Sequence, residues 1–208
     1  MILSIIIYGS RILKTRAEEI EPGTDIKELI QNMFDTLDTR ASGIGLAAPQ
    51  IGQGMRLFIV SIPGEKEEDR IKRVFINPEI LEYSEEKCWS KEGCISVPEI
   101  YEDVERPRLV KVKFLDENYV EHEEWFTGIL SRVIQHEYDH LEGKTFIDRL
   151  SNLRRTLIKN KLNMLKSKIV KKINKSRLNF YSLIFIILYR GWDSNPYGRN
   201  DQRSLNPP

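Results

Sequence analysis

Apolar and polar residues alternate with two different periods along this chain, and each period predicts a different kind of element. Between residues 25 and 40, apolar residues recur at helical spacing and predict an amphipathic helix that packs on a core. Asp25 can cap this helix, with Glu28 three residues further on. The apolar stripe consists of Ile26, Leu29, Ile30, Met33, Phe34 and Leu37.

Several shorter stretches have the pattern of strands. Residues 56–62 form an apolar run typical of a buried strand, and residues 73–82 form a second strand region that is interrupted at Pro78. Apolar residues alternate with lysines over residues 110–114, and a turn at residues 116–118 leads into a hairpin partner at residues 119–126.

A second helical pattern covers residues 128–141, and Gly143 stands where a left-handed residue commonly ends a helix. Short strands around one buried helix are typical of an α+β domain. We therefore expect antiparallel β-sheets packed around a central metal-binding helix, with an N-terminal and a C-terminal helix.

The last quarter of the chain has a different composition. Ten Lys and Arg and no Asp or Glu occur from Arg154 to Arg177. We expect a main domain at residues 1–151, a basic helix at 152–175, and a disordered or loosely attached extension at 176–208, because residues 191–208 are polar and rich in turn formers. Apolar positions at helical spacing in the basic helix are Leu153, Leu157, Ile158, Leu162, Leu165, Ile169 and Ile173.

Length and composition limit the classes of protein. A chain of 208 residues can form one domain with a real core. The apolar run at residues 180–189 is about half of the ~20 residues that a spanning helix needs, so no stable membrane span is expected. Two cysteines do not suggest a disulfide framework, which favours a reducing, cytoplasmic location.

Two of the three histidines fall in the second helical pattern. His136 and His140 are four residues apart, so on a helix both imidazoles leave the same face and can share a transition metal. Glu137 lies about 100° round the helix, near enough to reach a water molecule beside that metal. The pattern H-E-x-x-H is a metallopeptidase signature, although a histidine pair on a helix can also be a solvated or core pair.

Two histidines leave a metal without enough ligands. A catalytic site needs a third protein ligand, and no histidine follows His140. Few acidic residues follow Glu142, so an upstream cysteine, whose thiolate is a soft ligand, is the better candidate. Cys94 has Gly93 and Ser96 beside it, where the backbone can bend, whereas Cys88 next to Trp89 has the pattern of a packed strand residue.

Three motifs together resemble the peptide deformylase family, in the right order and spacing. They are Gly43-Ile44-Gly45-Leu46-Ala47-Ala48-Pro49-Gln50, then Glu92-Gly93-Cys94-Ile95-Ser96, then His136-Glu137-x-Asp139-His140-Leu141-x-Gly143. Alone, the first motif reads as a structural turn. The resemblance runs from about residue 8 to residue 150. One departure is Ile95, where leucine is commoner in the family, and this puts the shape of the pocket in doubt.

The resemblance implies a metal-dependent hydrolase that removes the N-formyl group from the initiator methionine of new polypeptides and releases formate. It places one Fe²⁺ per chain on Cys94, His136 and His140, with Zn²⁺ or Ni²⁺ as substitutes. Glu137 is then the acid and base, and the Gln50 amide and the Ile95 backbone N–H stabilise the oxyanion. The walls implied for the methionine pocket are Gly43, Ile44, Gly45, Ile95, Val133 and His136.

The expected partners are nascent N-formylmethionyl polypeptides and, through the basic helix, the ribosome, whose phosphates would attract it; no DNA binding is expected. A plain packing helix with a solvated basic face is the alternative. Asp139 is expected to pair with Arg106, either as an orienting contact or as an ordinary surface ion pair. Two other functions stay open, namely an H-E-x-x-H endopeptidase and a non-catalytic ribosome-associated module with a structural metal.

Overall fold

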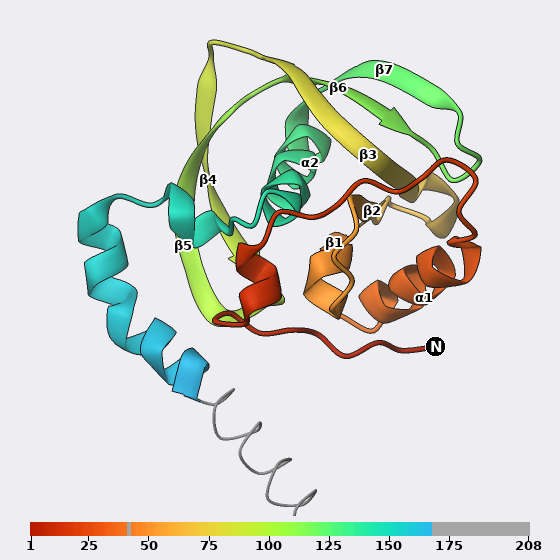
Figure 1. Cartoon of the computed structure of the whole chain (residues 1–208). Helices are drawn as coiled ribbons and strands as arrows, with labels where there is room; N and C mark the ends of the chain where they lie inside the picture. Colours follow the sequence, from red (N-terminus) through yellow and green to blue (C-terminus); the bar gives the residue numbers. More distant parts are fainter. Residues whose placement is uncertain (41–42, 168–208) are drawn as a thin grey trace, which may run out of the picture. The chain divides into compact units, whose positions relative to one another are not determined.

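Two antiparallel sheets and a central helix form the body of the protein in a computed structural model, which describes residues 1–40 and 43–167 (Figure 1). One sheet has five strands in the order β1-β2-β3-β6-β7, and the other pairs β4 with β5. The expected α+β class is confirmed. The strands are β1 (Gly45–Ala47), β2 (Leu57–Ile62), β3 (Ile71–Tyr83), β4 (Lys87–Cys94), β5 (Val97–Pro107), β6 (Val110–Leu115) and β7 (Glu121–Phe126).

The central helix α2 spans Gly128–Leu141, as the apolar pattern predicts. In Figure 1 it lies between the β4–β5 pair and the strands β1, β2 and β3. Val133, Ile134 and Leu141 pack with Phe58 and Phe75 in one core cluster. Gly143 has a φ of 66° and follows the helix, which is the left-handed position that favours glycine. Four short 3₁₀ helices connect these elements: Arg11–Lys14, Ala48–Ile51, Glu67–Asp69 and Phe146–Arg149.

The first helix, α1, is shorter than the range predicted for it. It covers Lys27–Asp38, within the predicted range of residues 25–40. Asp25 lies just before it and accepts a hydrogen bond from the backbone N–H of Lys27 at 3.3 Å, while Ile26 occupies the N-cap. Two residues of the apolar stripe, Met33 and Leu37, are fully buried, so the predicted core face is confirmed.

The interruption predicted at Pro78 is a local irregularity inside one long strand. The register between β3 and β6 shifts between Ile76 and Glu79, and Asn77 has a φ of 49°. The Asn77 side chain accepts a hydrogen bond from the N–H of Ile20 and donates one to its carbonyl, each at 2.8 Å. Pairing resumes beyond the shift, so β3 continues on both sides of the proline.

Two elements differ from the sequence analysis. The segment from Gly43 to Gln50 is not only a loop, because it contains the edge strand β1 and the start of a 3₁₀ helix. Strand β5 has no counterpart among the predicted strands, and of β4 only Cys88 was expected to lie on a strand. The inward positions of β5 include two charged residues, Glu102 and Arg106, and this removes the apolar alternation by which a half-buried strand is recognised.

A helix at residues 152–167 follows the main body. Ile158, Leu162 and Leu165 are buried in a cluster with residues of β5 and of the last 3₁₀ helix, whereas Leu153 and Leu157 are exposed. Ile169, Ile173 and all of residues 168–208 lie outside the described residues, so the proposed segments at 1–151, 152–175 and 176–208 stay a prediction. Within the described residues, no helix has the length and apolarity needed to cross a bilayer.

Candidate metal centre

The three predicted metal ligands come together from two elements. Cys94 is the last residue of β4, and His136 and His140 project from α2. The sulfur of Cys94 lies 3.2 Å from Nε2 of His140, and one ligand atom from each of the three residues lies within 4.8 Å of the others. One thiolate and two imidazoles at this spacing are a suitable donor set for one transition-metal ion.

The β4–β5 hairpin determines where Cys94 lies. The register of the pair shifts between Gly93 and Cys94, and the chain turns back immediately so that Cys94 pairs with Val97. A Cβ at Gly93 would lie 2.5 Å from the ring of Tyr101, so a larger residue here would force the exposed tyrosine side chain to move. Glycine therefore lets the ring of Tyr101 pack against the strand next to Cys94.

His136 is held by a carboxylate on the side away from the sulfur. Its Nδ1 lies 2.9 Å from Oε2 of Glu92, and both residues are buried. Burial lowers the pKa of His136, but hydrogen bonds to Cys94 and Glu92 outweigh this effect and raise the pKa well above its ordinary value. When Nδ1 carries the proton that Glu92 accepts, the lone pair on Nε2 is available to a metal.

His140 is in a different electrostatic environment. It is fully buried, and both burial and the neighbouring charge of His136 lower the pKa of its imidazole well below the ordinary value. Neutral imidazole is the form that binds metals. Nδ1 of His140 and Oε2 of Glu137 are buried and have no hydrogen-bond partner among the described residues.

Glu137 lies beside the three candidate ligands with a carboxyl group that burial keeps partly protonated. Burial raises its pKa to about 7, against the opposing charges of His136 and Arg106. Gly45 of β1 faces this carboxyl, and a Cβ at Gly45 would lie 2.5 Å from Oε1 of Glu137. The close approach of β1 therefore depends on the absence of a side chain at position 45.

Gln50 is buried with its amide directed at the same place. Its Nε2 lies 3.4 Å from the sulfur of Cys94 and 3.3 Å from the hydroxyl of Ser96. Its Oε1 accepts a hydrogen bond from the backbone N–H of Ala47 at 2.7 Å, which fixes the orientation of the amide. A free Gln50 in a surface loop is thus excluded.

A pocket of about 420 Å³ opens over this group of residues. All of the residues that the family resemblance implies for the methionine pocket line it, together with Gln50, Cys94 and Glu137. The sequence analysis did not identify several further lining residues. They are Arg40, Ser90, Lys91, Glu92, Gly93, Pro98, Glu99, Tyr101, Ile129 and Arg132.

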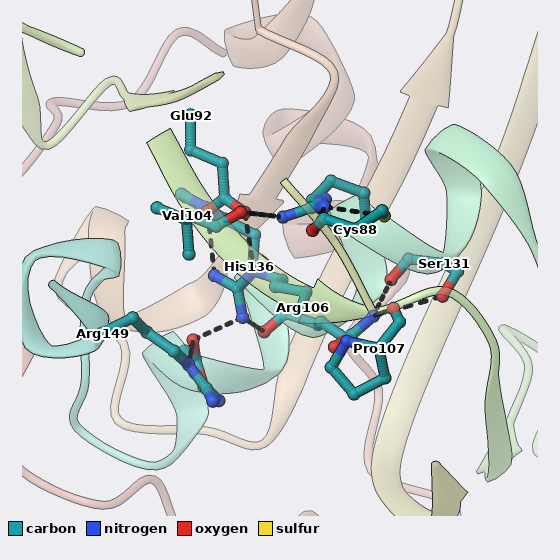
Figure 2. A network of polar contacts seen from close by, with 11 residues as sticks. Cys88, Glu92, Val104, Arg106, Pro107, Ser131, His136 and Arg149 are labelled. Carbon is teal, nitrogen blue, oxygen red and sulfur yellow. Dashed lines mark hydrogen bonds and ion pairs between the residues drawn. The ribbon is translucent and has the colours of Figure 1, made fainter. Parts of the chain in front are cut away.

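A buried network of charges lies behind the site (Figure 2). Arg106 is fully buried and donates from Nε and Nη2 to the two oxygens of Glu92, at 2.6 and 2.9 Å. Its Nη1 donates to Asp139 at 2.8 Å. The predicted pair of Arg106 and Asp139 is confirmed, and the surface alternative is wrong because the two side chains are 0% and 2% exposed.

The network also includes residues to which the sequence analysis gave no role. Arg149 donates to Asp139, and Arg132 donates to Glu92 at 3.0 Å. Arg132 stands one helical turn before His136, and Glu92 stands two residues before Cys94. These short separations from the ligands were the available signal.

Cys88 does not belong to the metal group. It is half-buried on β4, and its sulfur accepts a hydrogen bond from Nη2 of Arg132 at 3.1 Å. Cys88 therefore lies on a strand as predicted, but it is only partly buried and its sulfur takes part in a polar contact.

Known proteins match this chain over most of its length. The family model for polypeptide deformylase matches residues 2–156. A peptide deformylase of Christiangramia forsetii is 44% identical over 182 residues, covering 81% of this chain and 92% of its own, and one of Karelsulcia muelleri is 46% identical over 151 residues, covering 72% and 79%.

Solved structures agree in fold. A plant peptide deformylase superposes with a TM-score of 0.76 at 34% identity, covering 82% of this chain and 92% of its own. A peptide deformylase from Legionella pneumophila gives a TM-score of 0.71 at 37% identity, covering 82% and 98%. Neither an endopeptidase nor a non-catalytic module finds support in these matches. This chain belongs to the polypeptide deformylase family, enzymes that remove the N-formyl group from newly synthesised polypeptides.

Proposed function

We propose that Cys94, His136 and His140 bind the metal ion on which this deformylase depends, and that the native ion is Fe²⁺, with Zn²⁺ or Ni²⁺ as working substitutes. The observation that carries the proposal is the distance of 3.2 Å between Cys94 and His140, with His136 in the same group. A thiolate with two imidazoles suits all three metals, so the donor set alone does not select one. The chemistry that such an ion supplies is polarisation of the formyl carbonyl and acidification of a water molecule.

Glu137 is the acid and base in this proposal. Its carboxyl lies in the pocket beside the candidate ligands, and its Oε2 has no partner among the described residues. Glu137 takes the proton from the attacking water as the new bond from oxygen to the formyl carbon forms. The same proton then passes to the leaving nitrogen as the C–N bond breaks, which yields formate and a free α-amine.

Gln50 and Ile95 stabilise the negative charge that develops on the formyl oxygen. The amide of Gln50 already points at the sulfur of Cys94, and Ala47 holds its other end in place. The backbone N–H of Ile95 follows Cys94 directly in the tight turn between β4 and β5. Donors that are fixed before the reaction lower the barrier because they need no reorganisation.

The methionine side chain occupies the pocket in front of α2. Val133 stands one turn before Glu137 on the helix and lines the pocket together with Ile44 and Ile95, which supply apolar surface. Gly43 and Gly45 let the backbone of this segment come close to the substrate.

The decisive experiment combines metal analysis with two peptides. Protein purified without oxygen is analysed for bound metal and assayed with a formyl-Met peptide and with its unformylated counterpart. We expect Fe²⁺ in a ratio of about one per chain and formate release from the first peptide only. Formate release that is unchanged after all metal has been removed would contradict the proposed metal site, and internal cleavage of either peptide would indicate a peptidase.

We also propose that the basic helix brings the enzyme to the ribosome, in the cytoplasm where nascent chains emerge. Lys159 and Lys161 are exposed and form no ion pair among the described residues. The free thiols of Cys88 and Cys94 suit the reducing conditions of that compartment. Phosphates of ribosomal RNA would attract such lysines in a salt-dependent way.

The structure of this helix determines how the proposal is tested. Removing everything after Ser151 would also remove Ile158, Leu162 and Leu165 from the core, so a truncation would confuse docking with folding. Charge reversal of both Lys159 and Lys161 to Glu avoids this problem. We expect weaker co-sedimentation with ribosomes at low salt and unchanged formate release. The matched control, with the same change in net charge, is the double reversal of Lys27 and Lys66 to Glu at exposed positions outside this helix. Equal co-sedimentation of wild type and the variant at Lys159 and Lys161 would contradict the proposal.

A further inference from the structure

Arg132 is a buried arginine that joins the central helix to both strands of the smaller sheet. It lies on α2, is 8% exposed, and is surrounded by acceptors. Its Nη1 donates to Oε1 of Glu92 at 3.0 Å and to the carbonyl of Val104 at 2.9 Å. Its Nη2 donates to the carbonyl of Cys88 at 2.8 Å. One guanidinium thus links α2 to β4 and to β5.

Glu92 is held between two residues of the same helix. His136 stands one turn after Arg132, so both side chains leave the same face of α2. Arg132 donates a hydrogen bond to Oε1 of Glu92, and Nδ1 of His136 lies within hydrogen-bonding distance of Oε2. Arg106 donates to both oxygens from β5. Figure 2 shows Glu92 above Arg106 and His136 at the centre of this network.

Arg132 can affect the candidate metal site because it binds the oxygen of Glu92 that His136 does not contact. Without Arg132, Glu92 would be held by the fork of Arg106 on β5, and its only contact with α2 would be the one to His136 itself. Arg132 adds a contact from the helix that carries His136, so the carboxylate and the imidazole are fixed in the same frame. A ligand whose ring orientation is fixed binds metal more tightly, since less freedom is lost on binding.

We propose that Arg132 is a positioning residue for the metal centre, which acts through Glu92 on the orientation of His136. This inference rests on the proposed function, because it takes His136 to be a metal ligand. The hydrogen bonds of the Arg132 guanidinium go to Glu92, Val104 and Cys88 and not to the three candidate ligands, so its contribution is to hold the carboxylate that holds one of them. The same side chain lines the substrate pocket and a second pocket of about 380 Å³.

The substitutions are chosen to keep the shape of the two pockets that Arg132 lines. Arg132→Met keeps a long aliphatic stem where the side chain lines the pocket, and removes only the guanidinium. Arg132→Gln keeps an amide for the carbonyls of Val104 and Cys88 but carries no charge for Glu92. Arg132→Lys keeps the charge and serves as the conservative rescue. Gln135→Leu is the matched control, because its amide also ties α2 to β5, at 2.9 Å from the carbonyl of Pro107, without touching Glu92.

The measurement is the affinity of the full-length protein for Zn²⁺, obtained by competition with a chelator. We expect the dissociation constant to rise about 10-fold in Arg132→Met and Arg132→Gln, to recover in part in Arg132→Lys, and to be unchanged in Gln135→Leu. The proton on Nδ1 of His136, followed by NMR in the Zn²⁺ form, should exchange faster with solvent in the first two variants only. If Arg132→Met fails to fold, the comparison of Zn²⁺ affinity rests on Arg132→Gln.

The inference and the proposed function fail in different ways. If the wild type and Cys94→Ala bind Zn²⁺ equally, the proposed metal site is wrong. If Cys94→Ala loses affinity but the folded Arg132 variants bind Zn²⁺ as tightly as the wild type, the metal site stands and Arg132 has only a structural role. An equal loss of affinity in Gln135→Leu would also overturn the inference, because any loosening of α2 would then have the same effect.

Discussion

The sulfur of Cys94 lies 3.2 Å from Nε2 of His140, although 46 residues separate the two in the sequence. The strand that carries Cys94 and the helix that carries His140 belong to different parts of the fold, and the buried charges behind them join the two. Glu92, from the same strand as the cysteine, accepts hydrogen bonds from Arg106 and lies within hydrogen-bonding distance of His136. The candidate metal centre therefore lies against ion pairs that join β4, β5 and α2.

The two cysteines provide a matched pair of substitutions. Cys94→Ala removes one of three proposed ligands, so we expect loss of stoichiometric metal and of formate release from a formyl-Met peptide. Cys88→Ala removes only a sulfur that accepts a hydrogen bond from Arg132 and should retain both properties. Metal analysis and formate assays of the two variants, purified in parallel, check this expectation. Comparable metal content in both would show that Cys94 is not a ligand.

Glu137→Gln should separate metal binding from chemistry. The variant should keep its metal, because the carboxyl is not among the proposed ligands, and should lose roughly 10²–10⁴ in kcat, which is typical of a missing acid and base. Steady-state kinetics on protein with measured metal content provide the test. Activity close to that of the wild type would remove Glu137 from the mechanism.

The same substitution has an effect on stability that depends on pH. Burial raises the pKa of Glu137 to about 7 in the metal-free protein, so the protonated form is favoured in the folded state. The stability that this provides is fully present below the ordinary pKa of glutamate and is lost as the pH rises through about 7. Metal-free Glu137→Gln does not titrate there, so it should be more stable than the wild type at pH 8, by about 2 kcal/mol, and similar at pH 4. Thermal unfolding of both metal-free proteins at the two pH values gives the comparison, and a constant difference would contradict the burial of this carboxyl.

Sequence patterns predicted the elements whose apolar spacing is regular. Helix α2 begins and ends as expected because apolar residues recur at helical spacing in its first half and Gly143, with a positive φ, follows its last turn. Strand β5 was missed because Glu102 and Arg106 occupy inward positions, and only the partners supplied by other elements make such burial favourable. Strand β1 has three residues, too few for any period to be visible.

The candidate metal-binding and catalytic residues could be predicted from the sequence, but the residues that hold them in place could not. His136, Glu137 and His140 follow from spacing on a helix, Cys94 follows as the better candidate for a third ligand, and the family resemblance added Gln50. The positions of Glu92 and Arg132 relative to His136 depend on the register of β4 with β5 and on the packing of α2, which no local pattern contains.

Gly45 tests how closely strand β1 must approach the site. Alanine there would place a Cβ 2.5 Å from Oε1 of Glu137 and 2.8 Å from Cγ1 of Val133. The carboxyl of Glu137 has to move, so we expect Gly45→Ala to lower kcat by about 10²-fold, which is the usual cost of displacing a catalytic group by about 1 Å. Gly54→Ala is the control, because nothing lies within 4 Å of the added carbon. Normal kinetics in Gly45→Ala would mean that Glu137 can relocate without consequence.

Arg106 tests the contribution of the buried charges to the fold. Its guanidinium is fully buried, donates to both oxygens of Glu92 and shares Asp139 with Arg149, so Arg106→Met removes the bidentate partner of one buried carboxylate and one of the two arginine partners of the other. Removing one member of a buried pair typically costs about 3–5 kcal/mol, and we expect a loss of this size in the free energy of unfolding by urea. Arg108→Met is the matched control two residues further on, where the pair with Glu86 is 57% and 69% exposed and should contribute less than about 1 kcal/mol. Equal losses in the two variants would show that the buried network around Arg106 contributes no more to stability than an exposed ion pair does.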